Sequence, residues 1–168
     1  VFDFVGDVCV QSLHQTTSDE TWGQPQMSLT LGTHHVYFVA SRGVGPVVDG
    51  QTITWSLVRD TFWKDYEVTV MNTSNGNRAV TLDRVVSKLK ITINDVIPTG
   101  AATLSVTPAT WYYGLNIRTG AACGVRNDAP ISVSIPSGYI GTTGLAVSFF
   151  TISASEEWTT DVAVAIKD

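Results

Sequence analysis

The sequence has 168 residues, of which 43% are hydrophobic and 15% are charged, and its net charge is −5. A chain of this length can bury a hydrophobic core without the help of disulfide bonds or bound metals, so residues 1–168 are expected to form a single domain. The ten Lys and Arg residues are spread along the chain. We therefore do not expect the chain to bind nucleic acid, because a phosphate backbone is held by clustered basic side chains.

No apolar run approaches the roughly 18 residues that a membrane-spanning helix needs. The basic residues also form no cluster beside an amphipathic helix, so the chain itself is not expected to bind a membrane surface. The sequence opens without Met in the strand-like segment Val1-Phe2-Asp3-Phe4-Val5, which indicates a trimmed or matured form. Any signal peptide or lipid anchor is therefore expected outside this sequence.

Apolar residues recur at every second position along most of the chain, which predicts β-strands. In residues 85–94, Leu89 and Ile91 alternate with Lys88 and Lys90, as in a strand with one buried and one exposed face. In chain order, strands are expected at residues 1–10, 27–31, 36–40, 52–58, 66–71, 79–82, 85–94, 102–107, 131–135, 145–152 and 162–166.

Turn signals separate these strands. Asp49-Gly50 is predicted to join a segment around Val47 to the strand near Ile53. Asn75-Gly76 is predicted to form a hairpin tip, because Asn-Gly tolerates the positive φ of a tight turn.

Two stretches, 11–25 and 118–129, look irregular and are expected to be loops. The best helix candidate, Asp60 to Asp65, is too short to change the fold class. Many short strands without intervening helices predict an all-β, antiparallel β-sandwich.

The residues that usually bind metals are few. Cys9 and Cys123 match no metal-binding spacing, and they form either one long-range disulfide or two small buried hydrophobes. His34 and His35 are neighbours on a predicted strand, so they point to opposite faces and cannot bind one metal without a bend. No metal and no other cofactor is expected.

Catalytic patterns are also missing from the sequence. There is no Gly-x-Ser-x-Gly elbow and no phosphate-binding glycine loop. The carboxylates, such as Asp19-Glu20 and Glu156-Glu157, are interpreted as solvated surface groups rather than as a pair facing across a cleft. The chain is therefore predicted not to be an enzyme, and a hydrolase is kept only as a third hypothesis.

The aromatic run Trp111-Tyr112-Tyr113 is the best candidate for contact with a ligand. Exposed aromatic rings stack on sugars in carbohydrate-binding modules. Alternatively, these rings cover an open end of the sandwich or a junction with a neighbour. Trp22 and Trp158 also lie in polar surroundings.

The segment from Thr81 to Ile91, followed by Asn94-Asp95-Val96-Ile97-Pro98 and Ala101-Ala102, resembles a recurring segment of the fimbrillin-like proteins of the Bacteroidales. In that family an Arg, an apolar pair, a Lys and an alternating strand precede an Ile-Pro turn. Leu31 to Ala40 is similar to the family's glycine followed by an aromatic strand, and Val1 to Gly6 resembles a mature first strand.

The resemblance implies a transthyretin-like, Greek-key β-sandwich in a lipoprotein exported to the outer membrane and cell surface. Such subunits assemble into pili by strand exchange, and some serve as anchors or tip adhesins. The partners implied are other pilus subunits or surface proteins, and a host protein or glycan. No catalytic residue carries over. The rival hypothesis is a cell-surface carbohydrate-binding module that uses Trp111, Tyr112 and Tyr113.

Overall fold

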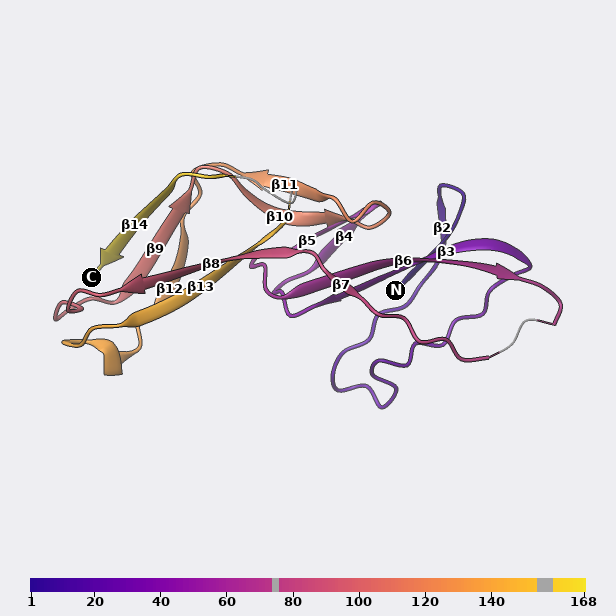
Figure 1. Cartoon of the computed structure of the whole chain (residues 1–168), viewed down its shortest axis with the longest axis horizontal. Coiled ribbons are helices and arrows are strands. Elements are labelled where there is room, and N and C mark those ends of the chain that lie inside the picture. Colours follow the sequence, from indigo (N-terminus) through magenta and orange to yellow (C-terminus); the bar gives the residue numbers. More distant parts are fainter. Residues whose placement is uncertain (74–75, 154–158) are drawn as a thin grey trace.

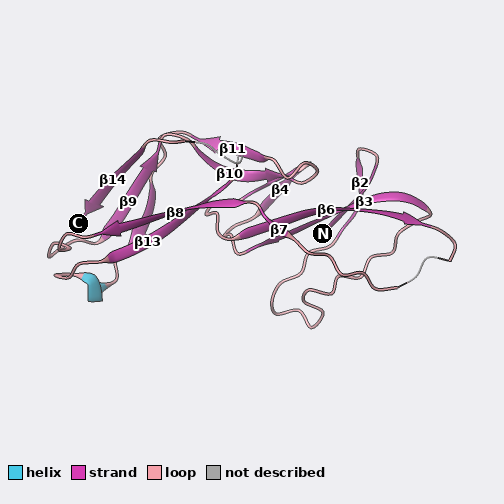
Figure 2. Cartoon of the chain, in the orientation of Figure 1, coloured by secondary structure: helices cyan, strands magenta, loops and turns pink. Residues whose placement is uncertain are grey.

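The computed structural model describes residues 1–73, 76–153 and 159–168, and the statements below on pairing and contacts concern these residues. Its strand pairs are antiparallel, which confirms the predicted all-β, antiparallel fold. The helix that it contains is one 3₁₀ turn (Figure 2). The elements are β1 (Phe2–Val5), β2 (Val8–Ser12), β3 (Gly32–Ser41), β4 (Val47–Asp49), β5 (Thr52–Thr54), β6 (Thr61–Val70), β7 (Asp83–Arg84), β8 (Val86–Ile93), β9 (Thr103–Pro108), β10 (Trp111–Asn116), β11 (Ala122–Arg126), β12 (Ile131–Ser134), η1 (Ser137–Tyr139), β13 (Leu145–Ile152) and β14 (Val162–Lys167).

The described strands form sheets that face each other in two pairs along the long axis (Figure 1). The first layer pair consists of the sheet β2-β1-β3-β6-β7 and the sheet β11-β10-β5-β4. The second layer pair consists of the sheet β12-β9-β14 and the two-stranded sheet β13-β8. This layered arrangement is a β-sandwich architecture, and the single-domain expectation for residues 1–168 stays a prediction.

The first layer pair encloses a core that both of its sheets supply. Phe4 and Tyr37 project from one sheet, and Ile53 and Leu115 from the other. The indole of Trp63 reaches across and donates a hydrogen bond to the carbonyl of Ile117 at 2.6 Å. The two layers are therefore joined by apolar packing and by a partly buried hydrogen bond.

The second layer pair contains β8, the strand whose alternating pattern is clearest in the sequence. β8 pairs with β13 over its whole length, from Val86↔Ile152 to Ile93↔Leu145. Its side chains alternate as predicted, since Lys88 and Lys90 are exposed. Phe149 of β13 packs against Val106 of β9 in the core of this layer pair.

Several predicted boundaries were wrong. Residues 1–10 fold as the β1–β2 hairpin around Gly6, which has a φ of +59°, and not as one strand. Residues 61–65 belong to β6 because they pair with β3, which overrides their local helical tendency. Residues 27–31 and 79–82 are not strands.

The Asp49-Gly50 turn is confirmed, because Asp49 pairs with Thr52 and closes the β4–β5 hairpin. The other predicted turn, Asn75-Gly76, has its Asn75 outside the described residues. The predicted loop 118–129 instead contains β11, which pairs with β10.

Candidate functional site

The aromatic run predicted to contact a ligand lies at the start of β10, where the two layer pairs meet. Trp111 is only 4% exposed and packs against Val106 and Phe149 in the second core. Its indole nitrogen donates a hydrogen bond to the carbonyl of Phe150 at 3.0 Å. The structure therefore places Trp111 in the interior, where it offers no flat ring to a sugar.

Tyr112 and Tyr113 are both half-buried. The backbone of Tyr112 is tied to β13, because its N–H donates to the Thr151 hydroxyl and its carbonyl accepts from that hydroxyl, both at 2.9 Å. Tyr112 thus belongs to the joint between β10 and β13. Tyr113 lies beside a surface pocket of about 260 Å³.

Arg126 of β11 gives this pocket its charge. Its guanidinium lies 4.2 Å from the ring centroid of Tyr113, a cation–π distance. Gly124 makes the stacking feasible, since a Cβ there would lie 3.2 Å from the Tyr113 ring. Sequence reasoning missed Arg126, because residues 118–129 were expected to be a loop.

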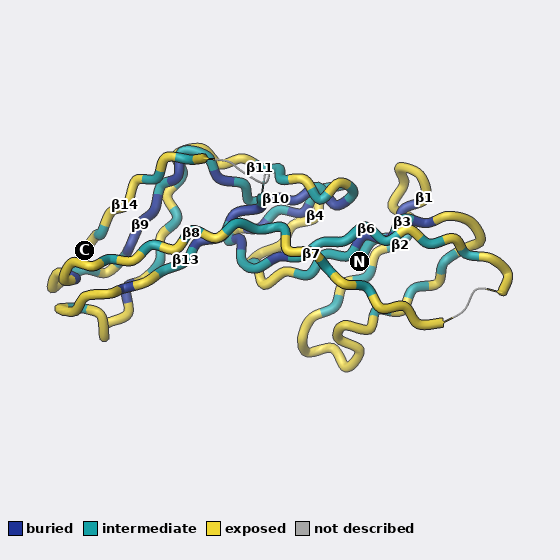
Figure 3. Tube along the Cα trace, in the orientation of Figure 1, coloured by how far each residue is buried: buried dark blue, intermediate teal, exposed yellow. Residues whose placement is uncertain are grey.

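The outer edge of β2 is a second candidate site. Among the described residues β2 pairs with β1 alone, so its other edge is open. Val8 and Val10 are 64% and 54% exposed, and the tip of the β1–β2 hairpin is exposed in Figure 3. The segment Val8–Ser12 contains no Lys, no Pro and no acid, which are the residues that usually protect an edge strand.

Arg118 holds this hairpin in place. Its guanidinium contacts the carboxylate of Asp7 at 2.6 Å and lies 5.8 Å from the ring centroid of Phe4. Hydrogen bonds to Tyr37 and Asp7 raise the pKa of Arg118 above its ordinary value, so the group stays charged. The hairpin that carries the β2 edge is therefore tied at its turn to Arg118.

Three other strands carry charged residues or Pro at their open edges. β4 follows Pro46 and ends in Asp49, and the outer side of β6 carries Lys64, Asp65 and Glu67. β14 is intermediate, because Val164 is 45% exposed while Lys167 closes the strand. β12 (Ile131–Ser134) and β13 (Leu145–Ile152) also lack charged residues, but neither contains a large hydrophobic side chain as exposed as Val8 or Val10. β2 combines an uncharged strand with exposed valines, which suits it to a partner strand.

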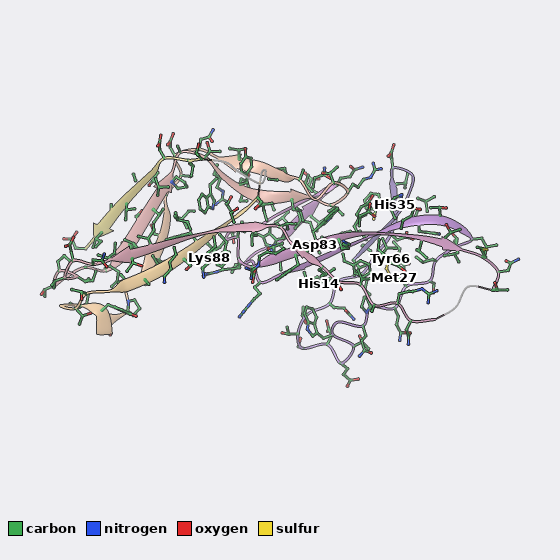
Figure 4. The ribbon with its side chains drawn as sticks, in the orientation of Figure 1. His14, Met27, His35, Tyr66, Asp83 and Lys88 are labelled. Carbon is green, nitrogen blue, oxygen red and sulfur yellow. The ribbon has the colours of Figure 1, made fainter. Side chains whose placement is uncertain are left out.

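His34 and His35 point to opposite faces, as predicted. His34 Nδ1 lies 2.8 Å from the buried carboxylate of Asp3, whereas His35 lies 3.1 Å from the half-exposed Asp65. In Figure 4 His35 and Tyr66 lie on opposite sides of the β3–β6 ladder, in keeping with the register. The described residues contain no group of three His, Cys, Asp or Glu side chains placed to hold a metal ion.

Cys9 and Cys123 are both free thiols in the structure. Cys9 is exposed on β2, and Cys123 is half-buried on β11, where burial raises the pKa of its thiol. Two further predicted surface groups, Trp158 and Glu156-Glu157, lie outside the described residues. In the described part of the chain no helix is long and apolar enough to cross a membrane.

Comparison with known proteins gives a likeness in fold. No protein-family model matches the sequence, and no curated protein matches it. The crystal structure of a candidate adhesin from Bacteroides ovatus superimposes with a TM-score of 0.53 at 14% sequence identity, over 79% of this chain and 53% of that one. The chain thus spans about half the length of this structural neighbour, and the likeness concerns the fold alone.

Proposed function

We propose that the chain is a non-catalytic adhesion or assembly module of a bacterial cell surface, similar to the fimbrillin-like proteins. The observation that carries this proposal is the open β2 edge, with Val8 and Val10 exposed on an uncharged strand. A strand from a neighbouring subunit would add to this edge by main-chain hydrogen bonds. The fold likeness to a candidate adhesin supports the same role.

The finer parts of the proposal come from the resemblance of residues 81–102 to the fimbrillin-like segment. They are a Greek-key, transthyretin-like topology, export to the outer membrane, and attachment through a lipid outside this sequence. The absence of catalysis is part of the proposal as well. His34 supports it, because Asp3 and the carbonyl of Thr30 already occupy its two ring nitrogens.

The structure gives little support to the glycan-binding alternative. It required exposed, coplanar rings at residues 111–113, and Trp111 lies in the core instead. One face of Tyr113 is covered by Arg126. We therefore favour association through the β2 edge.

Sedimentation velocity over a range of protein concentrations tests this proposal, with a second copy of the chain as the partner. The native chain should associate as its concentration rises. A double variant, Val8→Lys with Val10→Lys, should stay monomeric, because charges on an edge strand oppose pairing. The matched control Val164→Lys, on the edge strand β14, should associate like the native chain. A native chain that stays monomeric, or a control that abolishes association, would contradict the proposal.

A further inference from the structure

The surface pocket beside Tyr113 contains the charged side chain of Arg126, and its other described lining residues are uncharged. Its lining includes the apolar residues Val58, Phe149 and Ile131, and Arg126 is the only charged residue among the described residues that line it. In the part of the chain that the structure describes, no acidic residue lines the pocket and Arg126 forms no ion pair. The pocket thus offers a positive charge next to an apolar surface.

The two serine hydroxyls of the pocket are already engaged. The hydroxyl of Ser56 donates to the carbonyl of Val44 at 2.9 Å, and the hydroxyl of Ser132 donates to the hydroxyl of Ser105 at 3.3 Å. Among the described residues, Arg126 makes one long hydrogen bond, to the carbonyl of Ser56 at 3.5 Å. Most of its five N–H donors therefore have no partner in the described part of the chain and can bind a ligand.

The guanidinium is also held in position before any ligand arrives. It stacks on Tyr113, and Tyr113 packs over Gly124 in the neighbouring strand. A planar guanidinium fixed in this way matches the two oxygens of a carboxylate. Because the stacking restricts the side chain in advance, less conformational entropy is lost on binding.

We propose that this pocket binds a small carboxylate whose neighbouring group is apolar, such as an apolar amino acid, either free or at the C-terminus of a peptide. The volume of about 260 Å³ is below the roughly 300–1,000 Å³ typical of pockets for drug-sized ligands. It suits one side chain and one carboxylate. This site lies apart from β2 and does not rest on the proposed assembly function.

Isothermal titration calorimetry and NMR with four probes test the proposal on the whole chain. N-acetylphenylalanine supplies a carboxylate and an apolar ring, and N-acetylphenylalanine amide lacks only the charge. N-acetyl-Ala-Ala-Phe places the same carboxylate at the end of a peptide, and glucuronic acid pairs a carboxylate with a polar ring. The free acid should bind about tenfold or more tightly than its amide, because a charged hydrogen bond is lost in the amide. Glucuronic acid should bind more weakly than N-acetylphenylalanine.

Substitution tests the role of the charge. Arg126→Gln should weaken N-acetylphenylalanine binding about tenfold or more. The control Arg84→Gln, which removes a guanidinium 5.6 Å from the ring centroid of Phe62, should leave binding unchanged. The comparison of acid with amide in the native chain stands even if a variant fails to fold.

The tripeptide N-acetyl-Ala-Ala-Phe shows whether the pocket binds free acids or the C-termini of peptides. Binding that equals or exceeds that of N-acetylphenylalanine would assign the pocket to peptide C-termini, and exclusion of the tripeptide would assign it to free acids. The proposal would be overturned by equal binding of acid and amide, by unchanged binding in Arg126→Gln, or by no binding of any probe. Preference for glucuronic acid would overturn it in favour of an acidic sugar.

Discussion

His34 Nδ1 lies 2.8 Å from the Asp3 carboxylate, and each of the two side chains is 2% exposed. The pair joins β1 to β3, and the other ring nitrogen of His34 lies 3.0 Å from the carbonyl of Thr30. It lies on the side of the sheet opposite Phe4 and Tyr37, so it fixes the first strand from outside the apolar core. The neighbouring residue His35 forms a similar but half-exposed pair with Asp65, which provides an internal comparison.

Removal of the buried partner should destabilise the fold strongly. Asp3→Ala leaves the imidazole of His34 buried without its carboxylate, and we expect a loss of roughly 3–5 kcal/mol in the free energy of unfolding. Asp65→Ala, which removes the half-exposed carboxylate beside His35, should change this free energy by about 1 kcal/mol or less. Urea unfolding followed by circular dichroism measures both. Equal losses in the two variants would show that the Asp3–His34 pair is not a structural element.

Gly120 should tolerate no side chain. Its φ is +69°, and an added Cβ would lie 2.8 Å from the Trp63 ring, so strain and overpacking combine. Gly120→Ala should lower the free energy of unfolding by about 2–4 kcal/mol. Gly50→Ala is the matched control, because Gly50 has a φ of +55° but nothing within 4 Å. Thermal unfolding should therefore show a clearly smaller loss for Gly50→Ala, and equal losses would exclude the contact with Trp63 as the cause.

Trp111 should behave as a core residue. Trp111→Ala is expected to lower the free energy of unfolding by roughly 3–5 kcal/mol, the usual range for a large-to-small core substitution. Trp22, which is 48% exposed, serves as the control, and Trp22→Ala should stay within about 0.5 kcal/mol of the native chain. Chemical denaturation compares the two variants. If Trp111→Ala unfolds with the same free energy as the native chain, Trp111 is not a core residue. The glycan-binding alternative would then apply again.

The two thiols should differ in reactivity. Burial raises the pKa of Cys123, so a smaller fraction of it is thiolate at a given pH, and the thiolate is the reactive form. At mildly alkaline pH iodoacetamide should label the exposed Cys9 faster than Cys123. The difference between the two labelling rates should become smaller as the pH rises. Peptide mass spectrometry follows both sites. Failure of both cysteines to react before reduction would instead indicate the disulfide that the sequence left open.

The sequence predicts the fold class because its period-two pattern is strongest where one face of a strand is exposed. β8 shows this, with Lys88 and Lys90 alternating against half-buried residues, and its partner β13 was placed at its observed bounds. The β4–β5 hairpin was also predictable, since Gly50 takes the positive φ that the turn requires. These features depend on local backbone geometry and on burial of one face.

β10 and β11 were not predicted, because glycines interrupt their pattern. Gly114 lies in β10 where an added Cβ would meet Cys123 and Thr54 at 3.0 Å, and Gly124 lies in β11 beneath the Tyr113 ring. These glycines allow close packing between strands, although in a sequence they look like breakers. The burial of Trp111 could not be predicted from the sequence either, because it depends on Phe149, a residue distant in sequence.

Hydrogen–deuterium exchange of the whole chain, at low and at high protein concentration, tests the central claim most directly. Backbone amides that gain a partner strand exchange more slowly, because they leave water for a main-chain hydrogen bond. The account predicts new protection in β2, over Val8–Ser12, when the chain associates, and no change in β14. Association that protects β14 and leaves β2 exchanging as in the monomer would contradict it.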